Sequence, residues 1–188
     1  LMFVDYPDLS EKYAIDRAAR LVSLSIRDAQ VKAMAIKEDS QNQFPAYGAH
    51  FNKGNKKLIL IFSDSVTSGN TCKGTAPENC RYESGIDSIV ESRAFPTTAT
   101  ISNLCGNLKS NPPSGNKKEC NLQSITATFL RPTPTTFLKA IDSKGNNRDF
   151  QDIEIVLDLP SKTRKQQKII GITESGQIFI EDSRGVNY

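Results

Sequence analysis

The sequence predicts an α+β fold in which one long N-terminal helix packs on an antiparallel β-sheet, or sheets, of short strands. A single helical pattern runs from about Leu9 to Lys37. After Pro45 the apolar residues form short runs separated by turn residues, and no second helical pattern follows. With 188 residues the chain is long enough to bury its own core. We therefore expect one domain, 1–188, with a helix at about residues 8–38 and a β-rich head at about residues 46–188.

Capping and periodicity both predict the helix. Asp8 is a good N-cap residue, and Glu11 stands three positions later, as in a capping box. Pro7 fixes φ and indicates an extended approach to that cap. Small and apolar residues then recur at helical spacing, namely Ala14, Ala18, Leu21, Val22, Ser25, Ala29, Ala33 and Ile36. The helix would be on the order of 40 Å long, so its first turns are expected to extend beyond a sheet of short strands.

The rest of the chain is predicted to form strands joined by turns. Alternating or short apolar runs predict strands at residues 46–51, 58–62, 86–95, 98–104, 122–130, 136–141, 150–157, 168–173 and 177–181. Asn52-Lys53-Gly54-Asn55 is a turn cluster, and Gly176 can take the positive φ of a hairpin turn. The first two and the last two strands are therefore expected to pair as antiparallel hairpins.

The cysteine content favours disulfide bonds and an oxidising compartment. The even set comprises Cys72, Cys80, Cys105 and Cys120. Three pairings are open, and we favour Cys72–Cys80 with Cys105–Cys120 because each pair stands at the ends of one loop rich in Gly, Pro and Asn. A structural zinc site is the alternative, but it needs close pairs such as C-x-x-C, which the sequence lacks.

The sequence offers little chemistry for an enzyme. It has no G-x-S-x-G, no H-E-x-x-H and no glycine-rich phosphate-binding loop. The single histidine, His50, lies within a predicted strand, where we expect a surface or sheet-face residue. The Asp- and Asn-rich segment 142–149 is an alternative calcium loop, although its spacing matches no EF-hand. We expect no catalysis, no catalytic or metal-binding residues and no cofactor.

Several segments, in order along the chain, resemble the type IV pilin superfamily. They are the helix residues 17–21 and 29–35, the strand Tyr47-Gly48-Ala49-His50-Phe51, the strand end Ile61-Phe62-Ser63-Asp64 and the last hairpin, 172–178. Within the superfamily the chain is similar to minor pilins and to the H-type pseudopilins of type II secretion systems. This resemblance implies a pilin-like fold. It also implies an apolar N-terminal helix half that the sequence lacks, so we expect a piece of a longer protein.

Subunits of this family are anchored in the cytoplasmic membrane by the apolar helix half and pack helix against helix into a filament. The resemblance therefore implies a structural subunit at the bacterial cell surface, with other pilin or pseudopilin subunits as partners and no small-molecule substrate. The assembly-helix candidates are residues that a sheet would not cover: Leu9, Tyr13, Arg17, Arg20 and Leu24. Plain solvated surface is the alternative for each of them.

Other functions stay open. Some minor pilins take up DNA through basic residues in the closing hairpin, where this chain has Gln177 and Phe179. The basic-loop candidates stand earlier, at Lys162, Arg164, Lys165 and Lys168. The net charge of +3 gives no strong case for nucleic acid. A surface adhesin acting through its cysteine loops is a further alternative, and a secreted, disulfide-stabilised β-rich binding module is the alternative outside the family.

Overall fold

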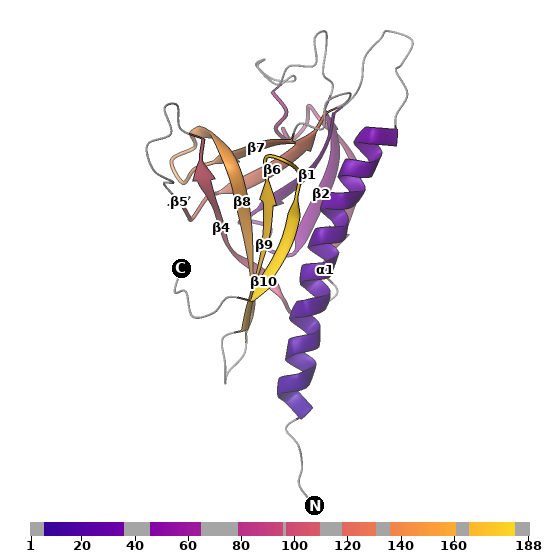
Figure 1. Cartoon of the computed structure of the whole chain (residues 1–188), viewed down its shortest axis with the longest axis vertical. Helices are drawn as coiled ribbons and strands as arrows, with labels where there is room; N and C mark the ends of the chain where they lie inside the picture. Colours follow the sequence, from indigo (N-terminus) through magenta and orange to yellow (C-terminus); the bar gives the residue numbers. More distant parts are fainter. Residues whose placement is uncertain are drawn as a thin grey trace, which may run out of the picture.

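A computed structural model of the chain describes residues 6–35, 46–64, 79–95, 97–109, 118–130, 136–160 and 166–182. Within these ranges one helix, α1 (Tyr6–Ala35), precedes ten strands (Figure 1). The strands are β1 (Ala46–Asn52), β2 (Leu58–Asp64), β3 (Ser88–Ala94), β4 (Thr100–Leu108), β5 (Lys118–Glu119), β6 (Ser124–Phe129), β7 (Thr136–Ile141), β8 (Asn147–Leu159), β9 (Gln166–Thr173) and β10 (Ile178–Asp182).

All ten strands belong to one antiparallel sheet in the described part of the chain. The main path runs β10-β9-β8-β7-β6-β1-β2-β3, and β4 adds to β8 and carries β5 on its far side. Strand β8 is 13 residues long. It connects one half of the sheet, β7-β6-β1-β2-β3, to the other half, β9-β10. Its first residues pair with β7, and its later residues, from Asp152 on, pair with β9.

A bulge bends β8 where its partner changes. Along the β4–β8 ladder Asn107 pairs with Asp152 and Leu108 pairs with Phe150, so Gln151 is an extra residue in β8. A bulge of this kind bends a strand and increases its twist. It also explains why the buried residues Phe150 and Ile153 stand three positions apart, whereas strict alternation would separate them by an even number.

The sheet curls around α1, whose buried side faces the core. The helix contacts β2 towards one end of the strand order and β9 and β10 at the other end. Its buried residues are mostly small, and they pack in one cluster with apolar residues from both halves of the sheet. The helical members of this cluster are Ile15, Ala18, Ala19, Val22, Ile26, Ala29 and Ala33. Small side chains allow the helix to approach the strands closely.

The expected pilin-like α+β class, a long helix on a sheet or sheets of short strands, is wrong. The structure is mainly β, with one N-terminal helix and a curled antiparallel sheet of ten strands in the described residues. The prediction treated each strand as a separate short unit. It missed the length of β8, which joins the strands into one curled sheet, and it missed the two-residue strand β5.

The predicted helix start is also wrong. Helix α1 begins at Tyr6, so Asp8 lies within its first turn instead of capping it. Pro7 is compatible with this position because the first turn of a helix leaves its backbone N–H groups without intrahelical partners. The helix is described to Ala35, and the predicted end at Lys37 lies outside the described residues.

Most of the other local predictions are confirmed. Strands β1 and β2 form the first hairpin, and β9 and β10 form the last. Gly176 in the closing turn has a φ of 79°. The predicted disulfide Cys105–Cys120 is present and ties the segment after β5 to β4. Because Cys72 lies outside the described residues, the predicted Cys72–Cys80 bond does so too.

His50 lies on the face of the sheet opposite α1, and it is buried. Its Nδ1 atom is 3.0 Å from the Thr126 hydroxyl, and its ring centre is 4.7 Å from that of Tyr82. Burial, with a smaller contribution from the charge of Arg81, lowers the pKa of His50 to about 4. The prediction of a sheet-face position holds, but the imidazole is not a surface group.

The buried imidazole makes stability depend on pH. In the unfolded chain His50 titrates near pH 6.5, so between that pH and about 4 the unfolded state binds more protons than the native state. The free energy of unfolding should therefore fall as the pH drops through this window. A pKa difference of this size corresponds to roughly 3 kcal/mol. His50→Asn should remove that part of the pH dependence in urea unfolding at pH 7, 5.5 and 4. Parallel profiles for the two proteins would contradict the burial of a neutral imidazole.

Candidate functional site

Helix α1 lies between the two ends of the curled sheet. The main path of the sheet ends at β3 on one side and at β10 on the other. Polar contacts connect the helix to β3 on one flank and to the β9–β10 hairpin on the other. One side of α1 therefore faces the core, both flanks are bonded to strands, and the remaining side faces outward. The N-terminal end of the helix extends beyond the strands (Figure 1).

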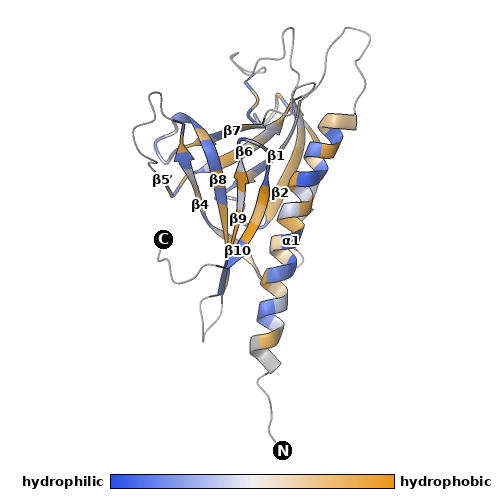
Figure 2. Cartoon of the chain, viewed as in Figure 1, coloured by the Kyte–Doolittle hydropathy of each residue, from blue (hydrophilic) through white to orange (hydrophobic). Residues whose placement is uncertain are grey.

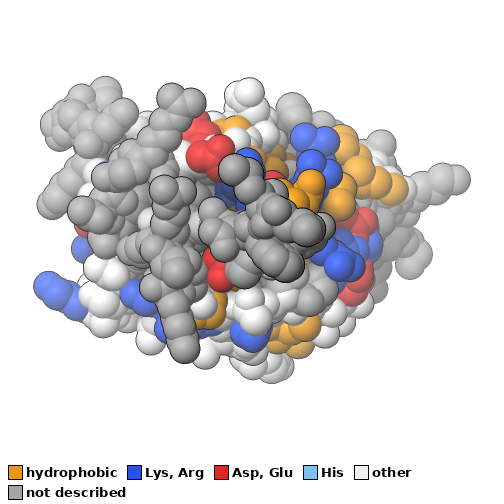
Figure 3. All heavy atoms as spheres, turned by 90° about the horizontal axis from the view of Figure 1, so that it is seen from below, with side chains coloured by type: hydrophobic (Ala, Val, Ile, Leu, Met, Phe, Trp, Pro, Cys, Tyr) orange, Lys and Arg blue, Asp and Glu red, His pale blue; other side chains and the backbone are white. Residues whose placement is uncertain are grey.

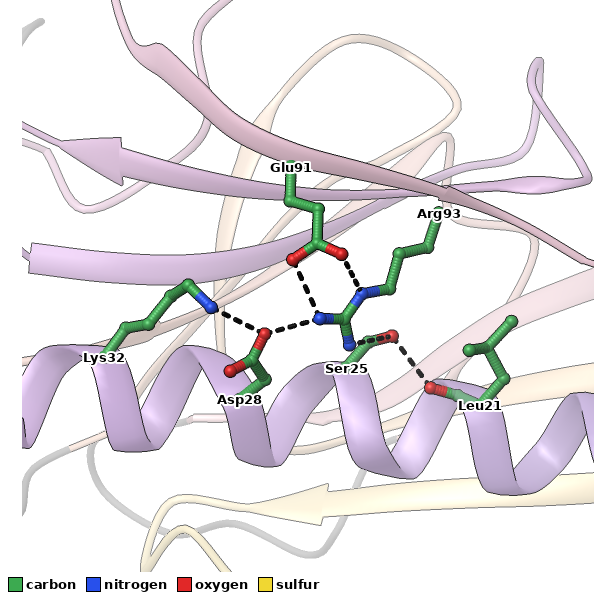
Figure 4. A network of polar contacts seen from close by, with 6 residues as sticks. All are labelled: Leu21, Ser25, Asp28, Lys32, Glu91 and Arg93. Carbon is green, nitrogen blue, oxygen red and sulfur yellow. Dashed lines mark hydrogen bonds and ion pairs between the residues drawn. The ribbon is translucent and has the colours of Figure 1, made fainter.

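Arg93 of β3 anchors the first flank (Figure 4). Its Nη2 atom donates to Asp28 of α1 at 2.6 Å and to Glu91 at 2.8 Å, and its Nε atom donates to the other oxygen of Glu91 at 2.7 Å. Its Nη1 atom is 3.3 Å from the Ser25 hydroxyl. A hydrogen bond from Lys32, together with the charge of Arg93, holds the pKa of Asp28 below its usual range. The cluster stays ionised near neutral pH.

The second flank is held by the C-terminal hairpin. The Lys168 ammonium group in β9 lies 2.8 Å from Asp16 of α1 and 2.5 Å from Asp182 of β10. Near the other end of the helix, the Gln30 side chain donates to the carbonyl of Gly176 at 2.8 Å. These contacts oppose rotation of the helix about its axis.

The second flank includes Lys168, one of the four basic-loop candidates. Lys168 is half-buried and is paired with two carboxylates, so its charge is already balanced within the fold. Lys162, Arg164 and Lys165 lie outside the described residues. Of the four candidates only Lys168 can therefore be placed, and the role of the basic loop stays a prediction.

The outward side of α1 carries large apolar side chains that nothing in the described chain covers. Tyr13 is 66% exposed, Leu24 is 59% exposed and Met34 is 60% exposed. Leu9 and Val31 are also more than half exposed. Single exposed apolar residues are common, but a row along one helix is typical of an interaction surface. We call this row, together with the arginines described next, the outer face of α1.

Three arginines share the outer face. Arg17, Arg20 and Arg27 are exposed, and among the described residues none of them has an ion pair or a side-chain hydrogen bond. Polar and apolar colours alternate along the visible length of the helix (Figure 2). Seen from below, the coloured basic, acidic and hydrophobic side chains are interspersed (Figure 3).

The structure places all five predicted assembly-helix candidates on the outer face. They are Leu9, Tyr13, Arg17, Arg20 and Leu24, and each is exposed. The prediction missed Arg27, Val31 and Met34, which continue the row towards the C-terminal end of the helix. Continuing the spacing of the first five along the helix would have identified these three. The assembly role of all eight residues stays a prediction.

No other part of the described chain forms a candidate site comparable to the outer face of α1. A hollow of about 440 Å³ lies beside His50 and Tyr82, but none of the described residues that line it is a carboxylate or a cysteine. The proposed calcium loop is organised by Asp142, whose carboxylate accepts bonds from the Asn146 side chain and from the backbone N–H groups of Lys144 and Asn146. Among the described residues, no group of three or more His, Cys, Asp and Glu side chains could hold a metal ion.

Comparisons with protein-family models, curated proteins and solved structures found no match to the chain. Among the described residues, no helix has both the length and the apolar character needed to cross a membrane.

Loss of the Arg93 contacts should destabilise the protein. In Arg93→Met the carboxylates of Asp28 and Glu91 lose their shared donor, and the half-exposed cluster should lose about 1–2 kcal/mol. Denaturant unfolding would measure the loss. Arg20→Met is the matched control, because that arginine has no ion pair or side-chain hydrogen bond among the described residues, and it should change stability by less than about 0.5 kcal/mol. Equal losses in both variants would contradict an anchoring role for Arg93.

Proposed function

We propose that this protein is a structural subunit of a bacterial surface filament, of the type IV pilus or type II secretion kind. It assembles by packing the outer face of α1 against helices of neighbouring subunits. The proposal assigns the β-rich head no catalytic step. The observation that carries it is the row of exposed apolar side chains on a helix whose opposite side is fixed to the sheet.

The way in which the helix is held supports an assembly role. Small inner residues and bonded flanks fix α1 in one orientation, so the outer face is presented without further ordering of the backbone. A preorganised surface loses less conformational entropy when a partner binds. Large side chains such as Tyr13 and Met34 can then contribute their apolar area to the interface.

The proposal rests on the helix and not on the fold class. A mainly β architecture with a curled sheet differs from the one expected for a pilin-like head. Its support is a long N-terminal helix that has an uncovered side and whose N-terminal end extends beyond the strands (Figure 1). We propose, as parts of the same function, that the protein is a member of the pilin superfamily and is located at the cell surface.

The alternative functions receive less support from the described residues. DNA binding through the basic loop would use Lys168, whose charge is already paired with Asp16 and Asp182. An adhesin acting through the cysteine loops would depend mainly on segments outside the described residues. Assembly through α1 is the function for which the described chain offers a continuous surface.

Polar substitutions on the outer face should block assembly while leaving the head folded. The full-length protein carrying Leu24→Ser, Val31→Ser and Met34→Ser should be produced in its native cells but should be absent from sheared and sedimented surface filaments. The reason is that three exposed apolar side chains are lost while the buried residues of α1 remain.

The control is Ile89→Ser, which removes an exposed apolar side chain from β3, where it pairs with Phe62 on the sheet face away from α1. This variant should enter filaments as the unchanged protein does. Thermal unfolding of each purified head checks that folding is intact. Normal incorporation of the triple variant, or absence of the unchanged protein from every surface filament, would contradict the proposal.

A further inference from the structure

The outer face of α1 has the spacing of a helix-pairing seam. Successive members stand four and three residues apart in alternation, the spacing of the contact positions in coiled coils. The seam consists of Tyr13, Arg17, Arg20, Leu24, Arg27, Val31 and Met34. It is roughly 30 Å long. It lies opposite the residues of α1 that enter the core, such as Val22 and Ala29.

The arginines stand inside this seam and not beside it. Arg17 and Arg20 lie between Tyr13 and Leu24, and Arg27 lies between Leu24 and Val31. A helix that covers the apolar members must therefore cover the guanidinium groups as well. Burying an unpaired charge is costly, whereas a facing carboxylate restores the lost hydrogen bonds and balances the charge.

A second copy of this chain cannot supply those carboxylates from the same face. The nearest acidic side chains of α1, Asp16 and Asp28, lie on its flanks and are bonded to Lys168 and Arg93 respectively. In a parallel, in-register pair of identical helices each arginine would face its own copy. Like charges at facing contact positions repel each other, and natural coiled coils use this repulsion to exclude wrong partners.

We propose that the partner of this seam is an amphipathic helix of a different protein, with carboxylates facing Arg17, Arg20 and Arg27 and apolar side chains facing Tyr13, Leu24 and Val31. The inference rests on the proposed function and narrows it, since the chain then joins a mixed assembly and does not polymerise with itself. The charges select the partner, and the apolar members contribute most of the buried area.

The same pattern argues against an anionic membrane as the occupant. A helix lying on a lipid surface presents a continuous apolar side, with its basic residues on the polar side or at the boundary. Here the three arginines interrupt the apolar row along its length. A membrane-bound orientation that buries Leu24 would also direct Arg20 and Arg27 towards the hydrocarbon.

Synthetic helical peptides test this specificity. Each peptide carries Leu opposite Tyr13, Leu24, Val31 and Met34, and either Glu or Lys opposite the three arginines, in both chain directions. Fluorescence anisotropy with the whole chain should show binding of a Glu peptide that weakens as salt increases, and at least tenfold weaker binding of the Lys peptides. The triple variant Arg17→Glu, Arg20→Glu and Arg27→Glu should reverse this preference.

The matched control is Lys56→Glu, Lys57→Glu and Lys144→Glu, which changes the net charge by the same amount at exposed positions outside α1. It should keep the preference for the Glu peptide. Equal binding of Glu and Lys peptides, or preferential binding to vesicles containing anionic lipid, would overturn the inference. Self-association through Leu24 and Val31 without a charge preference would also overturn it, but would leave the proposed function intact.

Discussion

The insertion of α1 between the two ends of the curled sheet is the constraint on which the rest of the structure depends. The bulge at Gln151 bends β8. The residues before the bulge pair with β7, and the residues after it pair with β9. The curl brings β3 and β10 to opposite flanks of the helix. An exposed sheet edge can pair with other chains, and a covering helix is one way in which proteins protect such edges.

The same arrangement determines which side of α1 is available to a partner. Ala18 and Ala29 let the helix approach the strands, while the ion pairs of Arg93 and Lys168 fix both flanks. Partly exposed ion pairs contribute little stability one by one. Here the ion pairs matter because they fix how the helix is rotated about its own axis. The core side chains of the helix are mostly small. The outer face is therefore a property of the fold and not of local sequence alone.

Local pattern predicted much of this structure. Helix period and strand alternation located α1 and most of the strands, and loop position gave the disulfide Cys105–Cys120. The bend of β8 was missed because it occurs at one extra residue, Gln151, although the three-residue interval between Phe150 and Ile153 carried that signal. The five assembly candidates proved exposed, whereas the pairing of Lys168 with Asp16 joins residues far apart in sequence and no local pattern reveals it.

Hydroxyl-radical footprinting with mass spectrometry tests most directly the claim that the outer face of α1 is the docking surface. The chain alone should be oxidised readily at Tyr13, Leu24 and Met34, which are exposed, and weakly at Ile26, which is buried. Saturation with a Glu-bearing helical peptide should protect Tyr13, Leu24 and Met34 and leave the exposed Ile89 of β3 unchanged. Protection confined to β10 or β3, or low reactivity of Tyr13 and Leu24 in the chain alone, would contradict the account.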